Sequence, residues 1–320
     1  MDRIMIVVDT RMRHSTAFQR GVALAGKTGA SLILLLVDHN PAVERARILD
    51  PGTHAQAVQG FLAVRRRWLD FEVAKLQEQG MRAAGIAAWH KPAYEEISRQ
   101  AMRQAPDIVI KDAAETGRFS RAVFTPVDWH LLRLCPAPLL VVSPHSSTWP
   151  QRILAAVDPF DTHGKPAGLN DAILRAALIL GRQCDAPVHL VHAWQYGAAA
   201  TPPPDAGLAG IGTALFEELR DEHRQDFIAL GEKYGVPAGR MHLLAGPPAE
   251  VIATLAEDIN ADLVVLGTAQ RTGLERVLMG ATAEDILDSI NSDVLAIKPA
   301  GFAETLKAEL AGRERGFGNG

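Results

Sequence analysis

The chain has 320 residues, a length typical of two domains, and its composition of 48% hydrophobic and 22% charged residues allows a full core to be buried. Residues 1–150 hold 19 basic and 14 acidic side chains, a balance of +5, and residues 151–320 hold 14 and 23, a balance of −9. This asymmetry is too weak to indicate a nucleic-acid partner, and the longest apolar runs are too short to span a membrane.

The usage of cysteine bears on the cellular compartment. Cys135 and Cys184 are the only cysteines. The first residues lead directly into a strand pattern at residues 4–10, and this predicts that no signal peptide is present. Two cysteines without an export signal indicate a reducing compartment rather than a disulfide framework. We therefore expect a cytoplasmic protein with buried, structural thiols.

Short apolar strands alternate with helical patterns along the whole chain. The predicted helices of the first half cover residues 15–27, 55–79, 94–104 and 126–134, and those of the second half cover residues 169–182, 213–234, 249–260 and 282–290. Strands that alternate with helices are joined by right-handed crossovers and form a parallel sheet with helices on both faces. The predicted fold class is therefore α/β.

The second half repeats the first at an offset of about 150 residues. The first strand of each half, for instance, is an apolar run that ends in an aspartate, Asp9 or Asp158. We predict two tandem Rossmann-like domains, each with a five-stranded parallel sheet. Their boundaries are placed at residues 1–146 and 147–300, and a C-terminal tail follows at residues 301–320.

A glycine-bearing loop follows the fourth strand of the second half. The apolar run DLVVLG ends at Gly267, and Thr282 begins a helical pattern as a hydroxyl N-cap. A strand, a glycine-bearing loop and a helix N-terminus together make a phosphate cradle, because unpaired backbone N–H groups point at the ligand. The alternative is that Gly267, Gly273 and Gly280 only make turns.

The string LGTAQRTGLERVLMGAT resembles the nucleotide loop of the universal stress protein family. That loop has a glycine, two residues, a second glycine, nine residues, a third glycine and then a hydroxyl or Asn residue. Gly267 and Gly280 match the first and third glycines, whereas Gln270 and Ala281 replace the second glycine and the hydroxyl. The string VFTPVDWHLLRLCPAPLLVV at 123–142 is similar to the tandem E type of this family.

The resemblance implies a stress-response protein that binds a small ligand and does not catalyse a reaction. It implies a degenerate site for ATP or a related adenine nucleotide, which binds weakly, and for Mg²⁺ only together with the nucleotide. Asp158 would face the nucleoside and the backbone of Ala193 the adenine. The binding residues that the resemblance carries over are Asp158, Ala193, Gly267, Thr268, Gly280, Ala281 and Thr282.

In the first copy, Lys111 is taken to replace the first motif glycine and Phe124 to stand roughly at the third. Neither residue lets a backbone approach phosphates as glycine does, so we expect no nucleotide there. Asp158 has a second interpretation, since an aspartate before Pro159 can simply begin a turn. The tandem repeat predicts an intramolecular pseudo-dimer and leaves a homodimer open.

Two other functions remain open from the sequence. The long apolar loop at residues 195–212 could cover a pocket between the two copies that takes an acyl chain, or could be a mobile cover without a ligand. A weak ATP hydrolase is the other alternative. The sequence has no Walker loop, no Gly-x-Ser-x-Gly motif and no cysteine and histidine spacing typical of a metal site. We therefore assign no catalytic and no metal-binding residue.

Overall fold

The computed structural model describes residues 1–45, 51–114, 124–144, 146–147, 149–159, 168–194, 221, 223–268, 270–272, 276–278 and 281–307. The chain forms two compact units. The first comprises Met1–Trp149 together with the chain from Asp293 onward, and the second comprises Pro150–Ser292.

The sheet of the first unit has the strand order β3-β2-β1-β4-β5-β12. Its strands are β1 (Arg3–Val7), β2 (Ser31–Asp38), β3 (Ala83–Trp89), β4 (Ile108–Asp112), β5 (Leu139–Val142) and β12 (Asp293–Ile297). The strands β1 to β5 all pair in parallel. The predicted five-stranded parallel sheet of the first repeat is therefore confirmed.

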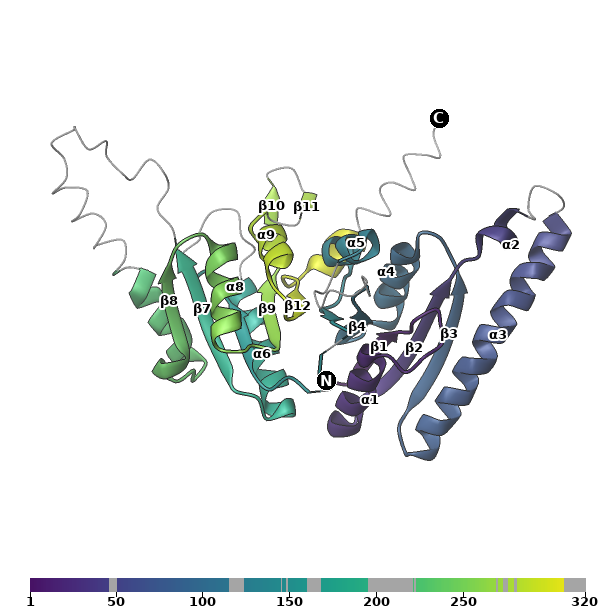
Figure 1. The fold of residues 1–320 in the computed structure, drawn as a ribbon, viewed down its shortest axis with the longest axis horizontal. Coiled ribbons are helices and arrows are strands. Elements are labelled where there is room, and N and C mark those ends of the chain that lie inside the picture. The colour runs from purple at the N-terminus through teal and green to yellow at the C-terminus, as the bar shows by residue number, and fades with distance from the viewer. Residues whose placement is uncertain are drawn as a thin grey trace. The chain divides into compact units, whose positions relative to one another are not determined.

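Two helical layers cover this sheet (Figure 1). The helices are α1 (Thr16–Thr28), α2 (Pro41–Arg45), α3 (Pro51–Glu78), α4 (Ala93–Gln104) and α5 (Pro126–Leu134). The rings of Phe18 in α1 and Trp68 in α3 lie 6.3 Å apart, so these helices share one layer. Tyr94 in α4 stacks on His130 in α5 at 4.1 Å and joins the other layer.

The strand β12 comes from the second repeat but is grouped with the first unit. It pairs antiparallel with β5, with Val294 opposite Val141. The prediction of purely parallel sheets is wrong for this pair, because a strand's apolar pattern does not encode the direction of its neighbour. Asp293 at the start of β12 is buried and accepts hydrogen bonds from Arg20 and from the backbone N–H of Ser143.

The second unit has four parallel strands in the order β9-β6-β7-β8. They are β6 (Ile153–Ala156), β7 (Val188–Trp194), β8 (Met241–Ala245) and β9 (Leu263–Gly267). Its described helices are α6 (Leu169–Cys184), residues 223–233, the 3-10 helix η3 (Ala238–Arg240), α8 (Pro248–Asp258) and α9 (Ala281–Ser289). The predicted glycine-bearing loop contains a hairpin of β10 (Gln270–Thr272) and β11 (Arg276–Leu278), which the sequence did not indicate.

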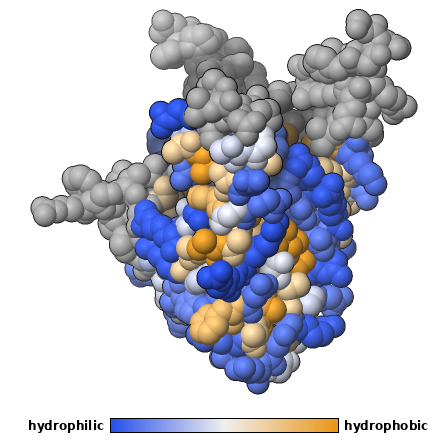
Figure 2. Space-filling model, turned by 90° about the vertical axis from the view of Figure 1, so that its right-hand side faces the viewer, coloured by the Kyte–Doolittle hydropathy of each residue, from blue (hydrophilic) through white to orange (hydrophobic). Residues whose placement is uncertain are grey.

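The outer face of α3 carries two exposed apolar side chains, Val64 and Phe71. Figure 2 views the molecule from the side of α3 and shows apolar groups interspersed with hydrophilic ones. In the described part of the chain, no helix combines the length and the apolarity that a membrane span requires.

Candidate functional site

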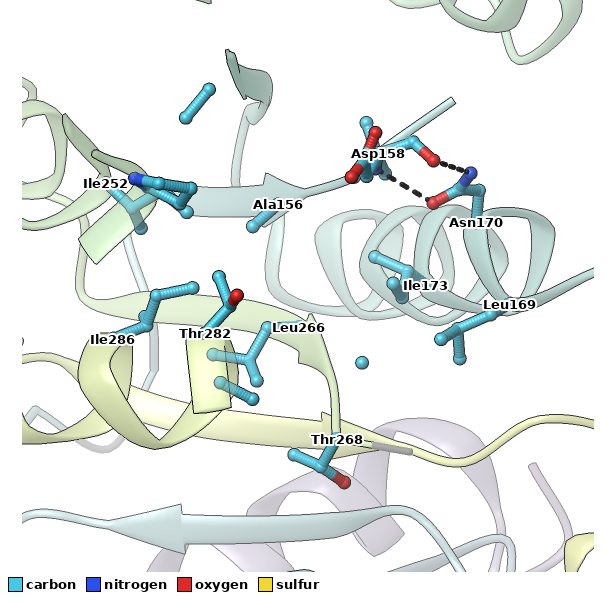
Figure 3. Close-up of a pocket in the computed structure, with 15 residues that line it drawn as sticks. Ala156, Asp158, Leu169, Asn170, Ile173, Ile252, Leu266, Thr268, Thr282 and Ile286 are labelled. Carbon is cyan, nitrogen blue, oxygen red and sulfur yellow. Dashed lines mark hydrogen bonds between the residues drawn. The ribbon is translucent and has the colours of Figure 1, made fainter. Parts of the chain in front are cut away.

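A cavity of about 200 Å³ lies at the carboxyl ends of the parallel strands in the second unit. Ligands of doubly wound sheets bind at this edge, because strands and helix N-termini converge there. Figure 3 shows Asp158 and Asn170 at one end of the cavity and Ile252 and Ile286 at the other. The lining residues are Ala156, Val157, Asp158, Leu169, Asn170, Ile173, Ala193, Pro248, Ile252, Leu266, Gly267, Thr268, Thr282, Ala283 and Ile286.

The structure brings most of the predicted site residues together. Those that line the cavity are Asp158, Ala193, Gly267, Thr268 and Thr282.

Two predicted residues are not part of this lining. Ala281 begins α9 but does not line the cavity, and Gly280 lies outside the described residues. The prediction that Thr282 is the N-cap is wrong, because α9 already begins at Ala281 and Thr282 is in its first turn. The apolar loop at residues 195–212 also lies outside the described part of the chain.

Asn170 at the start of α6 holds the backbone of Asp158. The backbone N–H of Asp158 donates to Asn170 Oδ1 at 3.1 Å, and Asn170 Nδ2 donates to the carbonyl of Asp158 at 2.8 Å. The carboxylate itself remains 38% exposed. Asn170 was not among the predicted residues, although a polar amide in the first turn of the helix that follows Asp158 is a signal that could have revealed it.

A pair of imidazoles lies behind Asp158. His192 is 2% exposed, and its Nδ1 lies 3.2 Å from the carbonyl oxygen of Val157 and 3.8 Å from Asp158 Oδ1. Its Nε2 lies 2.9 Å from His223 Nδ1. Because a carbonyl oxygen only accepts, the hydrogen bond between His192 and Val157 requires a proton on Nδ1 of His192. The pair thus fixes the carboxyl end of β7 beneath the cavity.

Gly267 is required by close packing rather than by a special backbone angle. A Cβ atom at this position would lie 2.6 Å from Leu169 Cδ2 and 3.0 Å from Leu169 Cγ. The glycine therefore lets the first turn of α6 approach the end of β9. This role is independent of any ligand, and it exists alongside the phosphate-loop role that the resemblance implies.

The sheet register corrects the correspondence between the two repeats. Ile4 pairs with Ile108 in the first unit, and Ile153 pairs with Leu263 in the second. Three residues after Ile108 and Leu263, Lys111 corresponds to Leu266, and one residue later Asp112 corresponds to Gly267. The interpretation that Lys111 replaces the motif glycine was therefore wrong by one residue.

Asp112, the true counterpart of Gly267, has a structural role of its own. Its carboxylate accepts hydrogen bonds from Ser15 Oγ at 2.5 Å and from the backbone N–H of Ala17 at 3.0 Å, which fixes the start of α1. Burial nevertheless raises the pKa of Asp112 above its ordinary value. The same one-residue offset applies at Phe124, because Thr125 directly precedes α5 as Gly280 directly precedes α9.

Histidines form a second close pair in this unit. His189 Nδ1 and His242 Nε2 lie 3.0 Å apart, and the rings are within 16° of parallel. His189 and His192 belong to different pairs. Among the residues that the structure describes, no group of three His, Cys, Asp or Glu side chains is placed to hold a metal ion.

The sequence profile of the Universal stress protein family matches residues 1–143 and, a second time, residues 150–298. The chain belongs to the universal stress protein family. The two matches show a tandem of two universal stress domains, which agrees with the repeat seen in the sequence and with the α/β fold of both units.

Relatives of the same family extend over nearly the whole chain. Universal stress protein E of Escherichia coli (strain K12) is 30% identical over 302 residues, which cover 92% of this chain and 93% of the relative. The homologue of universal stress protein E from Haemophilus influenzae is 27% identical and covers 93% and 97%. A crystal structure of a functionally unknown protein from Pseudomonas aeruginosa PAO1 has a TM-score of 0.75 at 26% identity, with 98% of each chain covered.

Proposed function

We propose that this universal stress protein is a non-catalytic binding protein whose second repeat takes a small ligand in the cavity beside Asp158, with weak affinity for an adenine nucleotide. The observation that carries the proposal is the convergence of Asp158, Ala193 and Gly267 on one cavity. Ala193 and Gly267 lie in β7 and β9, and Asp158 follows β6. The family resemblance had selected all three independently of any geometry.

The walls and the size of the cavity favour a nucleoside-sized group. Ile173, Ile252 and Ile286 offer apolar walls suited to a flat ring, and the partly exposed Asp158 carboxylate can accept hydrogen bonds from ligand hydroxyls. The volume of about 200 Å³ is smaller than the roughly 300–1,000 Å³ typical of ligand pockets. The phosphates of a nucleotide would therefore extend toward the N-terminus of α9, where the helix dipole favours an anion.

The loop is poorly suited to phosphates at two positions. Gln270 pairs with Leu278 in an antiparallel ladder, so its backbone is extended rather than turned inward as at a motif glycine. Adopting a left-handed conformation would cost this residue about 1 kcal/mol or more. Ala281 lacks a hydroxyl whose hydrogen bond to a phosphate would contribute roughly 1.5–3 kcal/mol. The two losses correspond to about two orders of magnitude in affinity.

Calorimetric titration of ATP with Mg²⁺ into the wild type and into the double variant Gln270→Gly/Ala281→Ser tests the proposal. We expect weak or no binding by the wild type and binding about 100-fold tighter by the variant, since the two changes restore the glycine and the hydroxyl. Low-micromolar binding by the wild type would contradict the argument from the loop. Phosphate release measured with and without Mg²⁺ should stay at the background rate, and turnover would refute the non-catalytic assignment.

A matched pair of variants locates the site. Asp158→Asn removes the carboxylate charge but leaves the backbone bonds to Asn170, so we expect about ten-fold weaker ATP binding by the double variant and little change in its stability. Asp9→Asn makes the same change at the corresponding position of the first repeat and should leave the affinity unchanged. Equal losses from both substitutions would place binding elsewhere.

A further inference from the structure

The first unit contains a cavity at the position that corresponds to the candidate site. Its volume is about 350 Å³, and its polar lining includes Asp9, Arg11, Arg13, Lys111, Asp112 and Thr125, whereas Asp128 lies behind Lys111 and is not part of the lining. Asp9 lies two residues after β1, as Asp158 lies two residues after β6. The two cavities therefore occupy the same place in the two copies of the fold, and their differences show how the copies have diverged.

Two corresponding positions differ most in chemistry. The sheet register equates Lys111 with Leu266, and α5 and α9 are both nine residues long, which equates Asp128 with Ala283. Leu266 and Ala283 both line the cavity of the second unit. In the first unit the same two positions form an ion pair, with Lys111 Nζ at 2.7 Å from Asp128 Oδ1.

Asp128 is held at the N-terminus of α5 and is fully buried, with a side-chain exposure of 0%. Its Oδ2 accepts hydrogen bonds from the backbone N–H of Thr125 at 2.7 Å and from Thr125 Oγ1 at 2.6 Å. Within the described part of the chain, its Oδ1 contacts Lys111 and has no other hydrogen-bond partner. Lys111 Nζ also donates to the carbonyl oxygen of Asp112 at 2.7 Å.

A helix N-terminus beside a lysine ammonium is the environment that binds phosphate in many proteins, because the helix dipole and the backbone N–H groups favour an anion. In the first unit a carboxylate of the chain already occupies this environment. A phosphate that entered would meet the negative charge of Asp128 and would compete with it for Lys111. Separating the buried pair would also leave a charge without compensation.

We propose that Asp128 is an internal anion that takes the place of a ligand phosphate in the first repeat. The pair of Lys111 and Asp128 then determines specificity, since Lys111 lines the first cavity but is already neutralised by Asp128 and does not attract a ligand phosphate. The corresponding cavity of the second repeat lacks this pair and keeps its helix N-terminus available. This proposal concerns the first repeat alone and stands even if the second repeat binds no nucleotide.

The test uses the full chain, inorganic phosphate as the probe and chloride at equal ionic strength as the reference. Asp128→Ala removes the internal anion and leaves Lys111 beside the N-terminus of α5. We expect this variant to unfold at a lower temperature than the wild type in chloride. Phosphate should raise its midpoint by about 3–6 °C at ten times the dissociation constant, beyond any rise seen in the wild type.

Two further variants separate the proposal from a general effect of phosphate. Lys111→Met/Asp128→Ala has no cation at the site and should lose the additional rise. Asp107→Asn removes a carboxylate that accepts from the backbone N–H of Arg3 at the opposite end of β4, so it should show only the wild-type response. The proposal would be overturned if phosphate raised the midpoint of Asp128→Ala no more than that of the wild type. It would also be overturned if Lys111→Met/Asp128→Ala showed the same rise as Asp128→Ala.

A failure of Asp128→Ala to fold in chloride does not prevent the test. Recovery of the folded state in phosphate but not in chloride would support the proposal. Asp128→Asn keeps the size of the side chain and removes its charge, and it should show a smaller phosphate-dependent rise of the same sign. If Asp128→Ala stays unfolded in phosphate and Asp128→Asn responds like the wild type, the proposal is wrong.

Discussion

The side chain of Lys298 is buried at the C-terminal end of α5. Its Nζ donates to the carbonyl oxygens of Leu132 and Arg133, and burial lowers its pKa to about 7. The pKa of the folded state is thus below the ordinary value of 10.5. Between these two pH values the unfolded chain binds more protons than the folded chain, so the stability rises with pH across this window.

Replacing Lys298 by methionine should remove this rise. For the wild type we expect the free energy of unfolding to increase by about 2 kcal/mol between pH 7 and pH 9 from this one group. Urea unfolding measured at both pH values should show that the free energy of unfolding of Lys298→Met increases less than that of the wild type, by the same amount of about 2 kcal/mol. Lys75→Met changes an exposed lysine and serves as the control. The same pH dependence in all three proteins would show that Lys298 is not the group responsible.

At the scale of elements, β7 and β8 are joined by the paired side chains of His189 and His242. Burial lowers the pKa of both imidazoles, and for His189 the neighbouring His242 lowers it further. As the pH falls below the ordinary histidine value of about 6.5, the unfolded chain gains protons before the folded chain does. The stability that the pair contributes is therefore complete above that pH and is lost on acidification.

The double variant His189→Gln/His242→Gln should be less sensitive to acid. We expect the denaturant midpoint of the wild type to fall more steeply between pH 7 and pH 5 than that of the variant, because glutamine does not titrate there. His90→Gln removes a histidine of the first unit that contacts Glu95, and it controls for the loss of any histidine. An acid response of the double variant equal to that of the wild type would contradict this assignment.

Elements with a long periodic pattern could be predicted from the sequence, and very short elements could not. The helix at 126–134 was predicted with its observed bounds, and the structure shows that Thr125 and Asp128 form a capping box at its start, with Pro126 as its first residue. The hairpin of β10 and β11 was missed, since strands of three residues are too short to show a period.

Single residues at strand ends were the weakest part of the prediction. The cavity residues Asp158 and Ala193 were selected by the family resemblance, and the structure places both at the cavity where the parallel strands end. The correspondence of Lys111 was wrong by one position, because only the hydrogen-bonded register fixes which residue of β4 matches Gly267. The antiparallel contact of β12 lies outside what any local pattern encodes.

For the whole molecule, the two placements of β12 differ. The sequence predicts that the second domain extends to residue 300, and this boundary remains a prediction, whereas the compact units of the structure place the chain from Asp293 onward in the first unit. The question is therefore which unit needs β12 for its stability. Arg20 and Asp293 form an ion pair there, and their side-chain exposures are 3% and 0%. Removal of one partner of a buried pair leaves an uncompensated charge and typically costs about 3–5 kcal/mol, whereas replacing both partners by apolar residues is often neutral.

Asp293→Ala should therefore destabilise the first unit in particular. In a Trp194→Phe background the remaining tryptophans, Trp68, Trp89, Trp129 and Trp149, all belong to the first unit, so their fluorescence follows its unfolding alone. We expect the urea midpoint of this signal to drop sharply with Asp293→Ala and to recover largely with Arg20→Met/Asp293→Leu, because no buried charge is then left alone.

Asp262→Asn serves as the control. It removes a carboxylate that accepts from the backbone N–H of Gln151 in the second unit, and it should leave the signal unchanged. If Asp293→Ala instead leaves the tryptophan transition in place and lowers only the far-ultraviolet dichroism transition of the second unit, β12 depends on its own repeat and the boundary at residue 300 describes the folding unit.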